Sequence, residues 1–197
     1  NVTFNQYTSR VRPAGSAAEL RKPGSLAPIP NSASFYFVDS GNHCIRRVDM
    51  PPEDFGYVST VAGGGTPSSG PGMGETGAEG FVDLQGEGSS LLQQARFRNP
   101  HSVAFISTDR DANGRGNEWG LVVADTGNSV IRVIRRDSGS PRDAPTGMVY
   151  TIAGKVGVTG YQDGNSFSNN LGRTSALFNM PTGVAVRQVP PVGYDSV

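Results

Sequence analysis

The sequence predicts an all-β protein built from repeated units. It contains 27 glycines and 14 prolines among 197 residues, and 36% of its residues are hydrophobic. Short runs of β-branched and aromatic residues lie between clusters of Gly, Pro, Asp and Asn, a pattern typical of short strands joined by turns. Blocks of sequence also return in the same order along the chain. Together these observations favour many short strands over a helical or α/β domain.

The repeat consists of three blocks. The first occurs three times without gaps, at residues 18–27, 95–104 and 176–185, with its proline at intervals of roughly 80 residues. The second block, FVDSGNHCIR at residues 37–46, returns as VADTGNSVIR at 123–132. The third, YVSTVAG at 57–63, matches MVYTIAG at 148–154. Fixed blocks separated by connections of variable length indicate repeated structural units.

Each unit is expected to hold four strands. The predicted strands are residues 25–29, 35–38, 44–48 and 57–62 in the first unit, and 102–106, 120–124, 130–134 and 148–153 in the second.

Between the second and third strands of each unit lies an Asp-Ser/Thr-Gly-Asn turn. Gly41 and Gly127 accept a positive φ at little cost, and Asn42 and Asn128 tolerate one, so a tight hairpin is expected. The carboxylates of Asp39 and Asp125 are predicted to bond backbone N–H groups of the same turn, a structural role and not a catalytic one.

These motifs closely resemble the NHL repeat. The segments that carry the resemblance in the second unit are VADTGN at 123–128, IR at 131–132, TIAG at 151–154, DG at 163–164, Phe178 and PTGVAV at 181–186. The first unit also contains Asn42-His43, and the resemblance covers about residues 18–197. NHL proteins form β-propellers, so the resemblance implies four-stranded antiparallel blades arranged around a channel.

The repeat also predicts how the chain is divided. We expect residues 1–17 to be the end of a preceding blade or a linker, 18–94 to be blade one, 95–175 blade two and 176–197 the first strand of a further blade. Comparable blade repeats have about 40 to 45 residues, so each unit carries about 35 residues of inserted loop. Propellers close with about four to eight blades. A partial propeller is therefore expected, completed within a longer protein or by other chains.

The repeat and the composition favour a non-catalytic scaffold that binds protein partners, which include the chains or domains that complete the propeller. Seventeen basic residues balance seventeen acidic ones, so no general attraction to nucleic acid is expected. No apolar run approaches a membrane span. The single cysteine, Cys44, is expected to pack as a small apolar side chain.

The loop at residues 63–92 contains four acidic side chains and no Lys or Arg: Glu75, Glu79, Asp83 and Glu87. We expect a solvated surface insertion here, with a docking surface as the alternative. Residues 89–97 could form one or two helical turns, with Leu92 and Phe97 packed against the blade.

One loop carries a candidate calcium site. Asp109, Asp111, Asn113 and Asn117 place side-chain oxygens at alternate positions around the glycine of Asn113-Gly114, as oxygen-seeking cations require. The spacing is similar to the calcium loops of EF-hands and of some propeller hairpins, although Gly120 stands where an EF-hand has its bidentate Glu. An ordinary polar hairpin is the alternative interpretation. This loop, with the start of the chain at Asn1, favours a cell-surface or extracellular location.

Two other functions remain open. Some NHL-type propellers, such as the peptidyl-amide-forming lyases, bind zinc through histidines; such a site needs three protein ligands, and this chain offers His43 and His101 alone. RNA binding, known for other NHL propellers, would use the arginines that cluster near the ends of the third strands, which are Arg46, Arg47, Arg132, Arg135 and Arg136. The same arginines could instead form a solvated blade edge.

Overall fold

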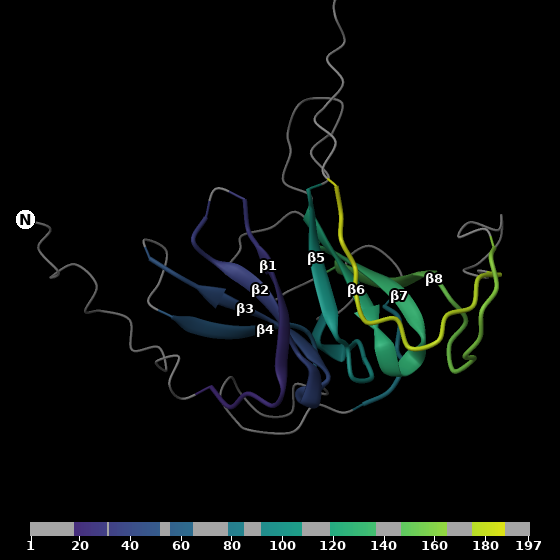
Figure 1. Ribbon diagram of the computed structural model, residues 1–197. Coiled ribbons are helices and arrows are strands. Elements are labelled where there is room, and N and C mark those ends of the chain that lie inside the picture. The colour runs from purple at the N-terminus through teal and green to yellow at the C-terminus, as the bar shows by residue number, and fades with distance from the viewer. Residues whose placement is uncertain are drawn as a thin grey trace, which may run out of the picture.

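A computed structural model describes residues 18–30, 32–51, 56–64, 79–84, 92–107, 119–136, 147–164 and 175–187. Its strands form two four-stranded antiparallel sheets, in which each strand pairs with the next along the chain (Figure 1). The first sheet contains β1 (Pro23–Pro28), β2 (Phe35–Asp39), β3 (Cys44–Asp49) and β4 (Tyr57–Gly63). The second contains β5 (Ser102–Ser107), β6 (Trp119–Asp125), β7 (Val130–Arg136) and β8 (Gly147–Ala153). The predicted all-β architecture of four-stranded propeller blades is confirmed.

All eight predicted strands are present, and their bounds differ from the predicted ones by at most two residues. Single-turn 3-10 helices connect β2 to β3 at η3 (Ser40–Asn42) and β6 to β7 at η5 (Thr126–Asn128). A third, η4 (Leu92–Gln94), lies where a helical turn was expected, and both Leu92 and Phe97 are fully buried. None of the helices in the described ranges has the length and apolar character needed to cross a membrane.

The two sheets share one hydrophobic core. β1 lies against β5, and the ring of Tyr36 on β2 stacks with that of Phe105 on β5 at a centroid distance of 6.2 Å. Buried side chains of both sheets join in one cluster that includes Ile45, Leu121 and Ile134. Since burial of a Leu or Ile side chain contributes about 1.5 to 3 kcal/mol, this shared core holds the two blades together.

Both sheets have a bulge at the same position of the repeat. The pairing of β3 with β4 shifts between Ile45 and Arg46, and the pairing of β7 with β8 shifts between Ile131 and Arg132. A bulge changes the direction of neighbouring side chains. The extra residue is Val61 in β4 and Ile152 in β8, so in each blade the bulge lies opposite the strand that carries the arginine.

The turn differs from its prediction in one respect. The left-handed residues are His43, with φ 54°, and Ser129, with φ 56°, and not the glycines or asparagines before them. Gly127 is required for a different reason: a Cβ atom there would lie 2.6 Å from the carbonyl oxygen of Arg98. Its N–H donates to that same oxygen at 2.8 Å, so the segment before β5 passes directly against the turn. In the first unit, a Cβ atom on Gly41 would likewise lie 2.8 Å from the carbonyl oxygen of Arg21, which accepts the Gly41 N–H at 2.7 Å.

Candidate functional site

The polar residues of the repeat meet in a buried network at the end of each second strand. In the second blade, Asp125 Oδ1 accepts the backbone N–H of Arg98 at 2.8 Å. Asp125 Oδ2 accepts Asn128 Nδ2 at 2.9 Å and Arg132 Nη1 at 3.2 Å. The side chains of Asp125 and Arg132 are both fully buried. One carboxylate thus joins the segment before β5, the η5 turn and β7.

The first blade contains the same network. Asp39 Oδ1 accepts the N–H of Arg21 at 2.8 Å, and Oδ2 accepts Asn42 Nδ2 at 2.9 Å and Arg46 Nη1 at 3.1 Å. Arg46 also donates to the carbonyl of Glu19 at 2.9 Å. The two aspartates are structural, as predicted, but their backbone partner is wrong in the prediction. Each accepts a backbone N–H from the segment before the first strand of its blade, that of Arg21 or Arg98. Neither forms a side-chain cap on its own turn.

Arg132 lies between two aromatic rings. Its guanidinium carbon is 4.7 Å from the centroid of Phe81 and 4.5 Å from that of Phe97. Cation–π contacts of this kind stabilise by about 0.5 to 2 kcal/mol, and more strongly when they are desolvated. Phe97 also lies over the end of the first blade, because a Cβ atom on Gly63 would be 2.8 Å from its ring. The arginine is therefore part of the junction between the two blades.

Asp83 supplies the second carboxylate to Arg132. Its Oδ1 accepts Nη2 at 2.6 Å and Nε at 3.1 Å, while the carbonyls of Val82 and Arg96 accept Nη2 at 2.6 Å and Nη1 at 2.5 Å. We call the group Phe81, Val82, Asp83, Arg96 and Phe97 the arginine clamp. It contributes two rings, two backbone carbonyls and a carboxylate to one guanidinium.

The clamp corrects the interpretation of residues 63–92 as a solvated insertion. Within that range, Val82 pairs with Arg96, and Leu84 pairs with Val149 at the outer edge of β8. Asp83 is bonded to Arg132 and is not an exposed acidic group. Of the other acidic residues in the loop, Glu79 lies 3.7 Å from Arg98 in an exposed ion pair, and Glu75 and Glu87 lie outside the described residues.

Burial raises the pKa of the Asp125 carboxyl above its ordinary value. The Arg132 guanidinium, the Asn128 amide and the Arg98 N–H oppose that rise. Removal of one partner from such a buried pair is strongly destabilising, because the other charge is left without compensation. The network therefore makes the blade depend on each of its members.

A second contact links the turn of one unit to the start of the next. His43 Nδ1 accepts the backbone N–H of Asn99 at 3.0 Å, and Ser129 Oγ accepts that of Met180 at 3.5 Å. Asn99 and Met180 are equivalent in the repeat, and both have positive φ, 44° and 50°. Partial burial lowers the pKa of His43; the positive charges of Arg21 and Arg98 lower it further, and Glu79 opposes them.

The candidate metal residues are not brought together in the part of the chain that the structure describes. His101 Nδ1 hydrogen-bonds to the carbonyl of Thr182 at 3.0 Å, whereas His43 is bonded to Asn99. Among described residues, no three His, Cys, Asp or Glu side chains are grouped closely enough to hold a metal ion. The candidate calcium residues Asp109, Asp111, Asn113 and Asn117 lie outside the described residues.

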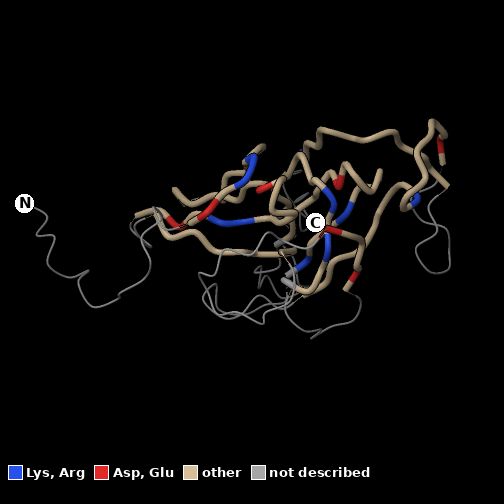
Figure 2. The backbone as a smooth tube through the Cα atoms, turned by 90° about the horizontal axis from the view of Figure 1, so that it is seen from below, with Lys and Arg blue, Asp and Glu red and all other residues tan. Residues whose placement is uncertain are grey.

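The remaining candidates have structural surroundings. Cys44 is buried, and burial raises the pKa of its thiol to about 12, with Asp39 raising it further and Arg46 opposing. Of the arginines considered for RNA, Arg132 is fully buried, Arg46 is paired with Asp39, and Arg47 is paired with Asp49 at 2.6 Å. Arg135 is half-buried, and the side chain of Arg136 lies outside the described residues. Basic and acidic positions are interspersed along the described backbone (Figure 2).

The sequence did not point to Phe81, Asp83 or Phe97 as partners of an arginine. A signal was present, because Phe97 and Phe178 occupy the same position of the repeat, and Asp83 stands in FVD as Asp163 stands in YQD. The FVD and YQD segments both precede the first repeated block, in a region where only a few residues of the two units align. Their role becomes clear only from the contacts across the junction.

No family model matches this chain, and no curated protein matches it. Its fold is similar to that of solved structures. One is an auxiliary nutrient binding protein from Bacteroides thetaiotaomicron, with 22% identity, a TM-score of 0.53, and coverage of 81% of this chain and 31% of that one. Another is an auxiliary nutrient binding protein from Bacteroides ovatus, with 26% identity, a TM-score of 0.51, and coverage of 82% and 31%. The chain thus spans 31% of the length of each, as part of a propeller-like fold.

Proposed function

We propose that this chain is a non-catalytic segment of an NHL-type β-propeller that acts as a binding scaffold within a larger protein or assembly. One observation carries the proposal: the polar residues that define the repeat form buried networks that hold each blade and, at Arg132, the junction between the two blades. Asp39, Asp125 and Arg132 are buried, and each aspartate accepts a hydrogen bond from the arginine of its own blade. These side chains therefore hold the scaffold and do not face a substrate.

The likeness to the Bacteroides ovatus structure supports a binding role, because that protein is described as nutrient binding. In a propeller, the loops at the ends of blades and the open blade edges are the surfaces available for recognition. Exposed large apolar side chains occur at both ends of the described chain, at Leu20 and Leu26 before and within β1 and at Tyr161 and Met180 after β8. Such groups favour contact with other polypeptide.

The alternatives have less support. An RNA-binding face would need accessible arginines, and Arg132 lies inside the clamp. A zinc-dependent lyase would need a third ligand beside His43 and His101, each of which has its own hydrogen-bond partner.

Sedimentation velocity of the full chain over a range of concentrations tests the proposal, with parallel arms for bound zinc and for retention of a mixed-sequence single-stranded RNA. We expect association that increases with protein concentration, no stoichiometric zinc and no salt-sensitive RNA retention. A monomer at every concentration that unfolds cooperatively would overturn the scaffold proposal. Stoichiometric zinc or RNA retention would replace it with the corresponding alternative.

A further inference from the structure

We propose that the last described parts of the chain, residues 155–164 and 175–187, are a docking site for strands two to four of a further propeller blade, whose third-strand arginine enters a second clamp with a backbone that is already formed. The inference rests on the proposed scaffold function and names the partner of one edge. It is supported by three features of this edge: the backbone of the clamp, the exposure of its side chains, and an extended segment without a ladder partner.

The backbone of the second clamp repeats that of the first. Around Arg132, Gly80 N–H donates to Phe97 O at 3.0 Å and Val82 N–H donates to Arg96 O at 3.4 Å. At the last edge, the equivalent bonds are Gly160 N–H to Phe178 O at 3.0 Å and Gln162 N–H to Leu177 O at 3.4 Å. The bridge between Val82 and Arg96 likewise recurs between Gln162 and Leu177. The backbone of the second clamp is therefore already formed.

The side chains are also equivalent. Tyr161 stands where Phe81 covers Arg132, Asp163 stands where Asp83 binds it, and Phe178 stands where Phe97 stacks on it. Phe178 lies against Gly154, where an added Cβ atom would be 3.0 Å from its ring, just as Phe97 lies against Gly63. One face of Phe178 is thus seated on the second blade.

No guanidinium occupies this second clamp among the described residues. Tyr161 is 96% exposed, and Asp163 is exposed and forms no ion pair with any residue that the structure describes. In the first clamp, by contrast, Arg132 is fully buried between the rings. The two rings, the carboxylate and the two carbonyls at these equivalent positions are the groups that bind one arginine side chain in the first clamp.

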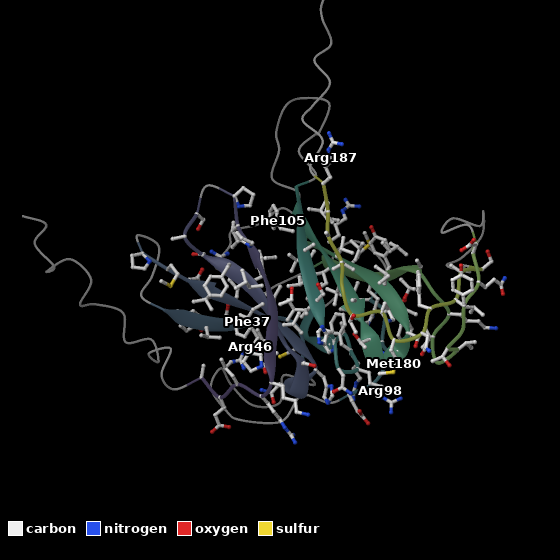
Figure 3. All side chains as sticks on the ribbon, viewed as in Figure 1. Phe37, Arg46, Arg98, Phe105, Met180 and Arg187 are labelled. Carbon is white, nitrogen blue, oxygen red and sulfur yellow. The ribbon has the colours of Figure 1, made fainter. Side chains whose placement is uncertain are left out.

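Residues 182–187 form an open template beside this clamp. The segment runs along β5, with Met180 toward the end where Arg98 lies and Arg187 toward the end where Phe105 lies (Figure 3). Thr126 Oγ1 donates to Pro181 O at 2.7 Å, and Val184 N–H donates to Ser102 Oγ at 3.2 Å.

The bond to Ser102 recurs between the first two units, where Val103 N–H donates to Ser25 Oγ at 3.4 Å. Residues 182–187 thus occupy the position of a first strand, yet they belong to neither sheet. An extended edge of this kind accepts an added strand through backbone hydrogen bonds.

These features define the occupant. It has a strand that pairs with 182–187, a turn with Asp and Asn, and a third strand whose arginine follows the Asn at the spacing of Asn128 and Arg132. An intact second copy of this chain does not fit at this edge, because its own β1 already holds the position of a first strand; self-association of the full chain would therefore use other surfaces. The occupant is therefore a unit of strands two to four without a first strand of its own.

The test uses the full chain and, as the probe, a synthetic peptide of residues 119–154, which contains β6, β7 and β8 of this protein. We expect saturable binding by calorimetry and slowed hydrogen exchange at the amides of Val184 and Val186 as the new ladder forms. Asp163→Asn in the chain, or Arg132→Gln in the peptide, should each weaken binding by about 30-fold or more, because a desolvated charge pair loses one partner.

Asp83→Asn is the matched control, because it removes the equivalent carboxylate at the occupied clamp. If Asp83→Asn weakens peptide binding and Asp163→Asn does not, the peptide replaces strands of the second blade. That result would overturn the inference. So would the absence of binding or of amide protection. If the peptide fails while the chain still associates in sedimentation, the docking site is wrong and the scaffold function stands; if the chain is also monomeric, the scaffold function fails as well.

Discussion

The guanidinium of Arg132 lies 4.5 Å from the ring centroid of Phe97, and this contact is one of those that connect the two blades. Phe97 belongs to the segment between the sheets and covers Gly63 at the end of β4. Arg132 extends from β7 and is held by Asp125 of its own blade and Asp83 of the connecting segment. The ring therefore has the end of one blade on one side and the buried arginine of the next on the other.

Substitution of Arg132 should be among the most destabilising single changes in the chain. Arg132→Gln leaves Asp125 and Asp83 without their cation, which in comparable buried pairs costs about 3 to 5 kcal/mol. The measurement is urea unfolding followed by circular dichroism. The matched control is Arg46→Gln at the equivalent position, where the arginine side chain is 16% exposed. The control should lose less stability; equal losses would mean that the clamp adds nothing to the Asp–Arg pair.

Gly127 should tolerate no side chain. In Gly127→Ala, the new methyl group would lie 2.6 Å from the carbonyl oxygen of Arg98, so the segment before β5 must move and break the bond to Asp125. We expect a loss of about 1 to 3 kcal/mol in thermal unfolding. Gly183→Ala serves as the control, since no atom lies within 4 Å of its Cβ position, and it should change stability by about 0.5 kcal/mol or less. Similar losses for the two variants would contradict the close approach.

The junction should weaken as the pH falls below the ordinary pKa of histidine. The pKa of His43 is lowered from 6.5 in the fold, so the unfolded chain takes up its proton first as the pH falls. The stabilising contribution is present above pH 6.5 and is lost as the pH falls through the lower pKa of the folded state. The N–H of Asn99 also donates to Nδ1 of His43, so this nitrogen must be unprotonated for the bond to form.

His43→Ser is the matched variant, because Ser129 makes the same contact in the next unit. Urea midpoints measured between pH 5 and pH 8 should fall more steeply on acidification in the parent chain than in this variant. Parallel curves would mean that His43 does not link pH to stability.

Cys44 should be unreactive in the folded chain. Burial raises the pKa of its thiol to about 12, from 9.0 in the unfolded chain, so little thiolate forms near neutral pH. Its labelling by a disulfide reagent at pH 8 should follow the rate of unfolding and accelerate in urea. Above about pH 9 the unfolded chain loses this proton first, so stability should fall as the pH rises toward 12. Fast labelling without urea would place the thiol at the surface.

The strands could be predicted closely because repeated blocks align β-branched runs with their flanking turns. The turn was predicted less well, since the left-handed residue depends on where the 3-10 turn ends, and that is His43 or Ser129 and not the glycine. Gly127 is needed because another segment passes against it. Such an approach between distant segments leaves no local pattern in the sequence.

The clamp illustrates a second limit. A third-strand arginine such as Arg132 has the sequence pattern of an edge charge or an RNA contact, and its burial depends on Phe81 and Asp83, which lie in a loop with acidic, glycine-rich composition. Composition describes the loop as a whole and does not separate the few residues that return to the blade. The candidate calcium loop at Asp109 stays a prediction.

A double-mutant cycle between Arg132 and Asp83 tests the central claim most directly, because it measures the bond between the connecting segment and the second blade. The free energy of unfolding in urea would be measured for the parent chain, Arg132→Gln, Asp83→Asn and the double variant. We predict a coupling energy of about 1 to 3 kcal/mol, as found for residues in one buried network. Additive losses, within about 0.5 kcal/mol, would contradict a junction built on this arginine.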